Sequence, residues 1–204
     1  MCPAKADGVR STRNVGDLTL ADEFVRWLRE NFSEHARPDD LTRTYDFVHD
    51  LNHSQEVDTY FSRPDVFRWR VVLYDPTGTS SACASRSVEP SAPLIVGTRG
   101  RVAFKDSIRV TVQEQGLATE IYRTEEALFR TWNIAEIHLE AALDGLAVWV
   151  RKGFQPTDRG FFEARYAEWA EEKGRDPAPL ASFAAYPEEF LRSLELLPMY
   201  KVLY

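Results

Sequence analysis

With 204 residues, of which 44% are hydrophobic and 28% charged, the chain is long enough for one globular domain whose core needs no disulfide or metal. Its formal charge of −7 argues against nucleic acid as a main partner, because phosphate binding relies on clustered lysine and arginine. Only two cysteines are present and no segment approaches the ~20 apolar residues of a membrane-spanning helix, so a cytoplasmic location is expected.

The first quarter of the chain is expected to be an arm followed by short helices. Residues 1–17 are polar and unpatterned, which is typical of a flexible N-terminal arm. An apolar stripe with helical spacing begins after Thr19, and a second helix is predicted over residues 39–51. A further short helical piece is predicted at residues 57–61, before a break at residues 62–65.

A group of β-strands is predicted next. The segment VFRWRVVLY at residues 66–74 is rich in β-branched and aromatic side chains, and the Asp-Pro-Thr-Gly sequence at residues 75–78 has the composition of a turn. The remaining elements of this region are predicted as a strand at 80–88, a loop at 89–93, and strands at 94–104 and 108–112.

The pattern changes after this β region, where helices and strands are predicted to alternate. Apolar residues recur at helical spacing as far as Trp132, and an alternation of apolar and polar residues over 136–141 indicates a strand. The remaining elements are predicted as a buried helix at 143–150, helices near 161–173 and 187–196, and a closing strand at 199–204. Residues 155–198 are therefore expected to form a helical insertion before the last strand.

The segment between the strand at 108–112 and the following helix carries the chemistry. It contains Gln113, Gly116 and Ala118, so that two small residues stand where the helix begins. A glycine lets a ligand approach the backbone, and an alanine keeps the next contact small. The unpaired N–H groups and the positive dipole end of the first helical turn favour an anion. The segment therefore predicts a pyrophosphate-binding site.

This segment resembles the GNAT superfamily of N-acetyltransferases, whose signature is Gln or Arg, two residues, Gly, one residue, and then Gly or Ala. The strand AEIHLEA lies where that family has its fifth strand, and WVRKGF resembles the family's aromatic and Gly-Phe ending. The resemblance implies an α/β (α+β) fold, with a mixed, largely antiparallel, splayed sheet of about seven strands flanked by helices. It also implies a single GNAT-like acyl-CoA-binding domain over residues 18–204.

The resemblance implies an N-acetyltransferase that moves the acetyl group of acetyl-CoA directly to an amine acceptor. The acceptor would be a small-molecule amine or a peptide amine, and neither nucleic acid nor a membrane is expected as a partner. The backbone of the fourth strand at Ile108, Val110 and Val112 would pair with the pantetheine arm. The pyrophosphate would be held by the amides of Gln113, Glu114, Gln115, Gly116, Leu117, Ala118 and Thr119.

The acid and the base of the reaction are less closely specified by the resemblance. The family's proton-donating tyrosine corresponds here to Trp149, so Tyr122, Tyr166 or a water would replace it, or no acid is used. Asp106, before the fourth strand, and Glu140, at the end of the fifth, are candidate catalytic bases, because burial can raise the proton affinity of a carboxylate. The alternatives are a turn residue for Asp106 and a solvated strand-end charge for Glu140.

Other interpretations of the sequence remain open. Trp149 in place of tyrosine and Glu114 in the anion loop are compatible with a GNAT-fold module that binds acyl-CoA or a partner without catalysis. His49 and His53 lie four residues apart and would share a helical face as zinc ligands do, but no third ligand is evident and no metal is expected. Both a monomer and a homodimer are compatible with the sequence.

Overall fold

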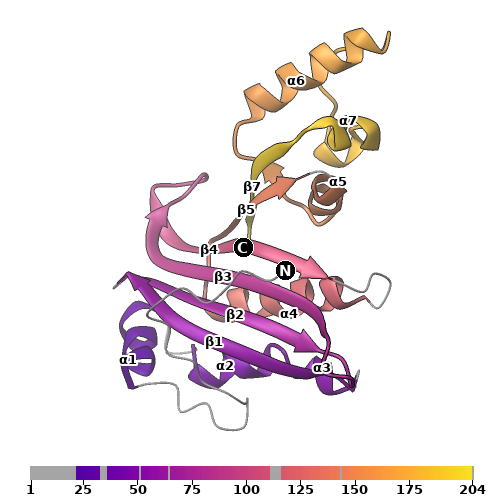
Figure 1. Cartoon of the computed structure of the whole chain (residues 1–204). Helices are drawn as coiled ribbons and strands as arrows, with labels where there is room; N and C mark the ends of the chain where they lie inside the picture. Colours follow the sequence, from indigo (N-terminus) through magenta and orange to yellow (C-terminus); the bar gives the residue numbers. More distant parts are fainter. Residues whose placement is uncertain are drawn as a thin grey trace. The chain divides into compact units, whose positions relative to one another are not determined.

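Residues 22–32, 36–50, 52–63, 65–110, 116–142 and 144–203 are described in a computed structural model. They form two compact units, one comprising the described residues up to Ala135 together with Leu203, and the other comprising Glu136–Val202. Figure 1 shows their helices and strands. No helix within these ranges is long and apolar enough to cross a membrane. The predicted arm at residues 1–17 lies outside the described ranges.

The first unit begins with three short helices, α1 (Asp22–Asn31), α2 (Pro38–Arg43) and α3 (Phe47–Asp50). Helix α1 confirms the first predicted helix, although Thr19 lies outside the described residues. The single helix predicted over residues 39–51 is wrong, because a turn at residues 44–46 divides it into α2 and α3. Trp27 of α1 and Leu41 of α2 are buried, so both helices pack through their apolar sides.

An antiparallel meander follows, made of β1 (Ser54–Arg63), β2 (Val66–Tyr74) and β3 (Ser80–Pro93). Strand β2 has the predicted bounds. The helical piece predicted at residues 57–61 is wrong, because Val57 pairs with Val71 in β1. Val57 and Phe61 are four residues apart, a spacing that fits one face of a helix and one face of a strand equally well. The loop predicted at residues 89–93 is also wrong, since these residues continue β3.

The fourth strand, β4 (Arg99–Val110), is continuous. The prediction of two strands separated by polar residues at 105–107 is therefore wrong. Lys105 remains in the strand because its amine is buried against the carboxylate of Glu125, at 2.6 Å. Residues 94–98 form a bend before β4 instead of the start of a strand.

Aromatic side chains fill the core of the first unit. The ring of Trp69 in β2 is fully buried, and its centroid lies 6.2 Å from those of Phe129 and Trp132. Phe129 belongs to helix α4 (Leu117–Thr131), which confirms the helix predicted to end near Trp132. Trp27 of α1 lies 5.5 Å from Phe67 of β2. Helices α1 and α4 thus cover the same face of the β1–β4 sheet (Figure 1).

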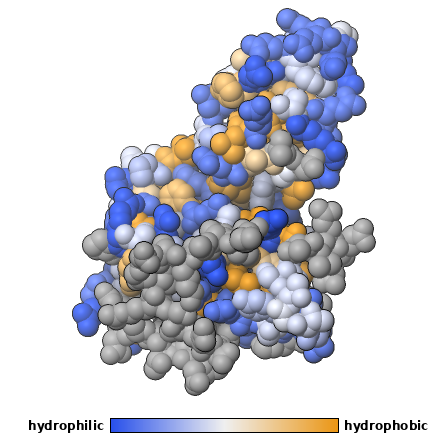
Figure 2. Space-filling model, viewed as in Figure 1, coloured by the Kyte–Doolittle hydropathy of each residue, from blue (hydrophilic) through white to orange (hydrophobic). Residues whose placement is uncertain are grey.

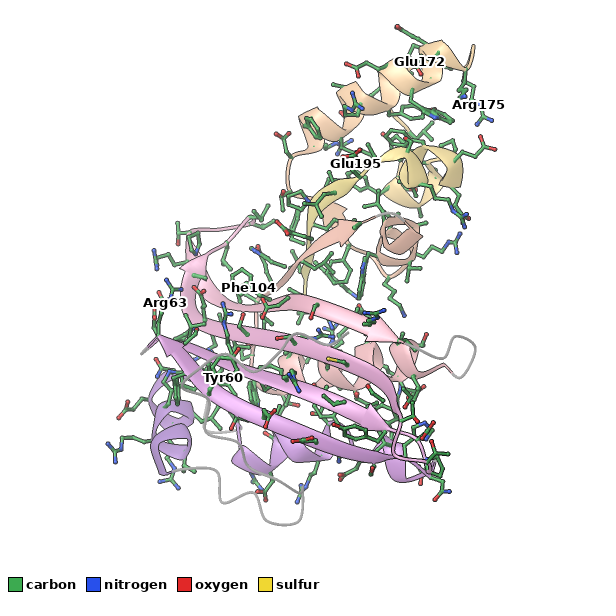
Figure 3. The ribbon with its side chains drawn as sticks, in the orientation of Figure 1. Tyr60, Arg63, Phe104, Glu172, Arg175 and Glu195 are labelled. Atoms are coloured by element: carbon green, nitrogen blue, oxygen red, sulfur yellow. The ribbon has the colours of Figure 1, made fainter. Side chains whose placement is uncertain are left out.

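The opposite face of the β1–β4 sheet carries polar groups. Side chains of Tyr60, Arg68, Ser87 and Phe104 occupy paired positions across the four strands and so share this face. Figure 3 labels the two outer members of this row, Tyr60 and Phe104, and also Arg63 at the end of β1. The mixture of polar and aromatic groups on this face contrasts with the apolar core beneath α1 and α4.

The second unit is built on three antiparallel strands, β5 (Glu136–Ala142), β7 (Leu196–Val202) and β6 (Gln155–Pro156), with β7 in the middle. Its helices are α5 (Asp144–Arg151), α6 (Arg159–Glu172), the 3-10 helix η2 (Phe183–Ala185) and α7 (Glu188–Ser193). The helices and strands predicted for this part of the chain are present, with ends displaced by a few residues. Asp158 caps α6, because its carboxylate accepts the Phe161 N–H at 2.8 Å.

A cluster of aromatic rings holds the helices of the second unit together. Phe162 is fully buried, and its ring centroid lies 5.4, 4.9 and 5.3 Å from those of Phe183, Tyr186 and Phe190. The surface over α6 is mainly hydrophilic (Figure 2). Charged residues labelled in this unit in Figure 3 are Glu172, Arg175 and Glu195. The unit therefore has its own aromatic core under a polar surface.

The fold-class prediction is confirmed. The described residues contain seven strands. Three helices precede the first four strands, and α4 follows these strands. A fifth strand, α5 and two further strands with helices between them complete the order. The strand AEIHLEA is the fifth strand, as the resemblance implied.

Candidate functional site

Strand β4 contains a bulge at one of the candidate catalytic residues. The pairing with β3 changes from Ser85 with Ser107 to Arg86 with Lys105, so Asp106 is the extra residue on β4. A bulge leaves its extra residue outside the regular ladder and bends the strand, and such bulges are frequent beside active sites. The bulge thus presents the backbone and side chain of Asp106 differently from those of its neighbours.

Asp106 is exposed as a residue, but its carboxyl group is partly buried against neighbouring side chains. The Ser87 hydroxyl donates to its Oδ1 at 3.3 Å. Burial by the surrounding strands raises the pKa of Asp106, although the charge of Arg68 and the hydrogen bond from Ser87 act in the opposite direction. A carboxylate with raised proton affinity is suited to accept a proton.

Five polar side chains form a hydrogen-bonded network between α4 and the strands. Glu125 Oε2 accepts from Arg86 Nε at 2.8 Å and from Lys105 Nζ at 2.6 Å. Its Oε1 accepts from the Tyr45 hydroxyl at 3.0 Å, and this hydroxyl accepts from the Trp69 indole N–H at 2.8 Å. The side chains of Arg86 and Glu125 have 0% exposure. The network is therefore a feature of the protein interior.

Two cations share one carboxylate in this network. Burial alone would raise the pKa of Glu125, but Arg86 and Lys105 outweigh it, so the pKa is lowered and the group stays ionised. Burial lowers the pKa of Lys105 to about 8, although its attraction to Glu125 opposes the shift. The pKa of Glu125 is lowered because two cations act on it. The pKa of Lys105 is lowered as well, because one carboxylate compensates only one of the two buried cations. Lys105 is accordingly the member that loses its charge first as the pH rises.

The network is not predicted from the sequence, although one signal for it is present there. Glu125 lies four residues after Ile121 and three before Leu128, which places it on the buried face of α4. A carboxylate among the apolar residues of a helix face requires a buried partner, because an unpaired charge is costly there. Arg86 and Lys105 are the partners that the strands supply.

Helix α4 begins at the predicted anion-binding segment. Gly116 is its N-cap, with the left-handed φ of 69° that favours glycine, and no side chain caps the helix. The N–H groups of Thr119 and Glu120 donate to the carbonyl of Gly116 at 2.9 and 3.0 Å. Helix geometry then leaves the N–H groups of Leu117 and Ala118 without intrahelical partners. The set of backbone amides predicted to bind the pyrophosphate is therefore smaller, because the N–H group of Thr119 is already bonded within the helix.

The other residues of the first unit that are predicted to bind coenzyme A differ in their burial. Ile108 and Val110 are half-buried on β4. Leu117 is buried, so its contribution to a ligand is restricted to its backbone, whereas Ala118 is exposed. The predicted residues that lie outside the described ranges are Val112, Gln113, Glu114 and Gln115.

Glu140, the second candidate base, lies on β5 in the second unit. It is exposed and is paired with Pro198 of β7. Trp149, at the position of the family's tyrosine, is half-buried on α5, and its ring centroid lies 5.3 Å from that of Phe154 in an edge-to-face contact. Trp149 thus contributes to the packing of α5 against the turn that follows it.

The two tyrosines considered as alternative acids both donate hydrogen bonds elsewhere. The Tyr122 hydroxyl donates to Glu126 on the next turn of α4, and burial together with this carboxylate raises the pKa of Tyr122. The Tyr166 hydroxyl donates to the carbonyl of Asp176 at 3.4 Å, and Tyr166 is buried. These contacts favour water over either tyrosine as a proton donor.

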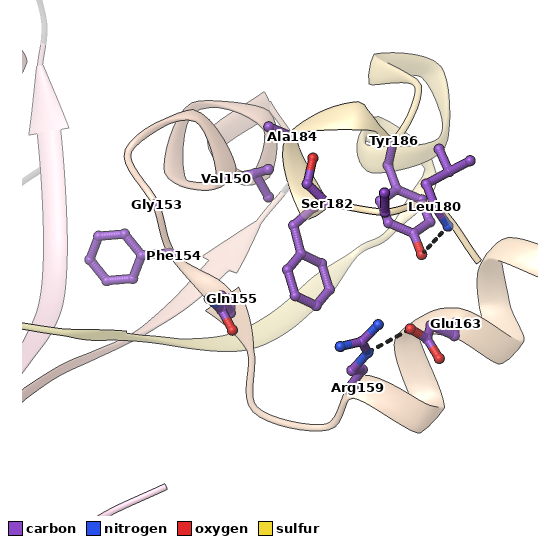
Figure 4. Close-up of a pocket in the computed structure, with 12 residues that line it drawn as sticks. Val150, Gly153, Phe154, Gln155, Arg159, Glu163, Leu180, Ser182, Ala184 and Tyr186 are labelled. Carbon is purple, nitrogen blue, oxygen red and sulfur yellow. Dashed lines mark hydrogen bonds and ion pairs between the residues drawn. The ribbon is translucent and has the colours of Figure 1, made fainter. Parts of the chain in front are cut away.

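A cavity of about 330 Å³ lies within the second unit (Figure 4). The ion pair of Arg159 and Glu163, at 2.6 Å, lies at one side, and Tyr186 accepts the Leu180 N–H at 3.1 Å. The remaining lining residues are Val150, Gly153, Phe154, Gln155, Ala181, Ser182, Phe183 and Ala184. The cavity is therefore lined by both charged and apolar side chains.

The histidines do not form a metal centre within the described residues. His53 donates its backbone N–H to Val48, and the side chain of His49 lies outside the description. His138 is hydrogen-bonded through Nε2 to the buried Glu136 at 2.7 Å. Over the described ranges, no three His, Cys, Asp or Glu residues are grouped as metal ligands.

Comparisons with known proteins give matches among solved structures only. No protein-family model matches the chain, and no curated protein sequence matches it. A nourseothricin acetyltransferase is 15% identical, with a TM-score of 0.40, over 72% of this chain and 71% of that protein. Spermidine N-acetyltransferase SpeG from Vibrio cholerae is 17% identical, with a TM-score of 0.37, over 96% and 92% of the two chains.

A GNAT family N-acetyltransferase, YhbS from Escherichia coli, in complex with CoA, is 13% identical, with a TM-score of 0.36, over 99% of this chain and 86% of that protein. These similarities are too low to assign an activity. The order of strands and helices in this chain, with α4 between the fourth and fifth of seven strands, agrees with the order that the resemblance implied.

Proposed function

We propose that the chain is an N-acetyltransferase that transfers the acetyl group of acetyl-CoA to the amine of a small molecule or a peptide. The observation that carries this proposal is the start of α4. A left-handed Gly116 stands at the N-cap, no side chain caps the helix, and Gly116 and Ala118 occupy the small positions of the acetyltransferase signature. The signature that begins at Gln113 would thus include a helix N-terminus suited to an anion.

The start of α4 fits the pyrophosphate of coenzyme A. The N–H groups of Leu117 and Ala118 and the positive end of a 15-residue helix favour a bound anion. A side chain added at Gly116 would meet no atom of the described residues within 4 Å. Glu120 is the acidic residue of the first turn, and it forms an ion pair with Arg123 at 2.8 Å. This pairing reduces the repulsion that Glu120 would exert on an anion.

Asp106 is the favoured general base, with Glu140 as the alternative. Asp106 lies at the bulge of β4, and its raised pKa matches the requirement for a group that accepts a proton from an ammonium. Coenzyme A supplies the thioester whose C–S bond breaks as the amine N–C bond forms. The ammonium passes one proton to the carboxylate before the amine attacks, and the second proton that the nitrogen loses reaches the departing thiolate through water. Transfer should therefore increase as the pH rises through the pKa of Asp106.

A second candidate function is a module that binds acyl-CoA without catalysis. Trp149 favours it, because an indole N–H is a poor proton donor to a thiolate and the ring is engaged with Phe154. A thiolate, with a reference pKa of about 8.5, leaves without a strong acid, so Trp149 is also compatible with transfer. The two functions differ in one observable, which is saturable acetyl transfer to an amine.

The test is a transfer assay with acetyl-CoA and a panel of polyamines, aminoglycosides and peptides with free N-termini. Saturable transfer supports the enzyme, and its absence in a folded protein that binds coenzyme A supports the binding module. The assay is repeated with Asp106→Asn and Glu140→Gln. A loss of about 100-fold or more in kcat for Asp106→Asn, and less than about threefold for Glu140→Gln, supports Asp106 as the base. The reverse pattern assigns this role to Glu140.

A further inference from the structure

We infer that Arg86 and Glu125 are positioning residues that fix the bulge of β4 relative to the start of helix α4. This inference rests on the proposed function, because the bulge carries the candidate base and the start of α4 would bind the pyrophosphate of the coenzyme. The two side chains are buried, so neither is assigned a direct contact with substrate.

Arg86 bridges the pair of residues next to the bulge. Its Nε donates to Glu125, and its Nη1 donates to the backbone carbonyls of Ser85, at 2.7 Å, and Ser107, at 2.5 Å. Ser85 and Ser107 are paired across β3 and β4, directly before the register shifts at Asp106. One guanidinium therefore ties both strands to α4 at the position of the bulge. The planar fork of an arginine can make such bonds together, whereas a lysine amine cannot reproduce their geometry.

The other side of the bulge is tied to the same carboxylate. Lys105, which precedes Asp106, donates from Nζ to Glu125 Oε2. Lys105, before Asp106, is thus connected to Glu125 through its side chain. Ser107, after Asp106, is connected to Glu125 through its carbonyl and Arg86. Glu125 is also bonded to Tyr45, so the carboxylate itself is held in place. The bulge therefore has little freedom to shift along α4.

Stability alone does not explain a buried network of this kind. A buried ion pair is often no more stabilising than well-packed apolar residues of the same size, because both charges lose their hydration. Hydrogen bonds with defined directions do, however, fix one arrangement of the groups that they join. The contacts of Arg86 with two backbone carbonyls indicate that the arrangement of β3 and β4 is what the network fixes.

Helix α4 connects this network to the candidate coenzyme site. Glu125 lies eight residues after Leu117, which corresponds to about 12 Å along the helix axis. Because a helix is rigid over this length, holding Glu125 also holds the N–H groups of Leu117 and Ala118. Arg86 and Glu125 would thereby set the distance between the pyrophosphate site and the bulge. A displacement of about 1 Å between reacting groups can reduce a rate about 100-fold.

The experiment compares Arg86→Lys with Arg165→Lys, a matched control in an exposed ion pair on α6. Amide hydrogen exchange of residues 104–110 and steady-state transfer kinetics are measured for both. Arg86→Lys is expected to raise the exchange rate of this segment at least about tenfold, with α4 still protected. It is also expected to lower kcat about 10- to 100-fold, with a change of less than about threefold in the KM for acetyl-CoA. Arg165→Lys should change neither quantity.

Unchanged exchange at residues 104–110 in Arg86→Lys overturns the inference, whether or not the protein binds coenzyme A. Equal losses in kcat and in coenzyme affinity overturn it as well, because they indicate general disruption of the site. Raised exchange in a protein that binds no coenzyme A supports the anchoring of the bulge and rejects only the proposed function.

If Arg86→Lys does not fold, the triple exchange Arg86→Met, Lys105→Met and Glu125→Leu replaces it, because removing all three charges together is tolerated better than leaving one buried charge uncompensated. The same increase in exchange supports the inference in that variant, and native-like exchange contradicts it.

Discussion

Arg86 and Lys105 donate to the same oxygen of Glu125, Oε2, at 2.8 and 2.6 Å. Arg86 comes from β3 and Lys105 from β4, so one carboxylate of α4 joins two strands. Its ionisation is maintained by two cations, and its geometry is completed by Tyr45. The network thus links the stability of the first unit to the charges of Arg86, Lys105 and Glu125, and it joins these charges to the bulge of β4.

Glu125→Gln should strongly destabilise the first unit. The amide would leave Arg86 and Lys105 buried without a compensating charge, which costs roughly 3–5 kcal/mol in free energy of unfolding. Urea unfolding followed by tryptophan fluorescence measures this change. The control is Glu120→Gln on the same helix, where the side chain is 38% exposed and the expected change is within about 0.5 kcal/mol. A loss below about 1 kcal/mol for Glu125→Gln would show that the network is not the main constraint on α4.

Lys105→Met should change the pH dependence of stability. The folded pKa of Lys105 is about 8, against 10.5 for an ordinary lysine, so between these values the unfolded state binds more protons than the folded state. The free energy of unfolding of the wild type, relative to that of Lys105→Met, should therefore rise by about 2 kcal/mol between pH 7 and pH 10. Urea unfolding at several pH values tests this. A difference that stays constant, or that falls, contradicts a lowered pKa for Lys105.

Gly116→Ala should cost about 1 kcal/mol in stability through backbone strain alone. The residue has a φ of 69°, which disfavours a Cβ, and a Cβ built there meets no atom of the described residues within 4 Å. Gly145→Ala in α5 is the control, because Gly145 lies in a helix without a left-handed φ and its Cβ would make an ordinary 3.6 Å contact with Trp149. That variant should be neutral or stabilised by up to about 1 kcal/mol. Thermal unfolding that ranks the two variants in the opposite order would contradict this account of the N-cap.

Phe162→Ala should destabilise the second unit by roughly 3–5 kcal/mol, because it removes a fully buried ring from contact with Phe183, Tyr186 and Phe190. The neighbouring Phe161 is 52% exposed, so Phe161→Ala is a matched control with an expected loss below about 1 kcal/mol. Unfolding monitored by hydrogen exchange within residues 136–202 separates the two. Similar losses for both variants would show that this aromatic cluster is not the core of the unit.

Strong local patterns predicted the elements that the structure confirms. VFRWRVVLY combines β-branched and aromatic residues with a following turn, and the apolar positions of 117–132 repeat at helical spacing. The segment at residues 57–61 has no pattern that distinguishes a helix from a strand, because the spacing of Val57 and Phe61 fits the periods of both. Its pairing with β2 decides the outcome, and that pairing is a tertiary contact.

The candidate site was predictable where it depends on local sequence. Gly116 identified the start of α4, because a glycine that lets a ligand approach the backbone stands directly before the apolar positions of the helix. The bulge at Asp106 was not predictable, because Lys105-Asp106-Ser107 has the composition of a turn. Lys105 stays within β4 only because Glu125, 20 residues away, supplies its partner. The periodicity of α4 places Glu125 on the buried face of the helix, but it does not identify Lys105 as the partner.

Calorimetric titration with acetyl-CoA tests the central claim most directly, which is that the start of α4 binds the coenzyme. We expect the wild type to bind with a Kd on the order of 10 μM, and Gly116→Asp to weaken binding at least about tenfold, because a carboxylate there repels the pyrophosphate. Gly116→Ala separates backbone strain from charge and should weaken binding less than Gly116→Asp. Equal affinity of Gly116→Asp and wild type, or no heat from folded wild type with acetyl-, propionyl- or free coenzyme A, would contradict the claim.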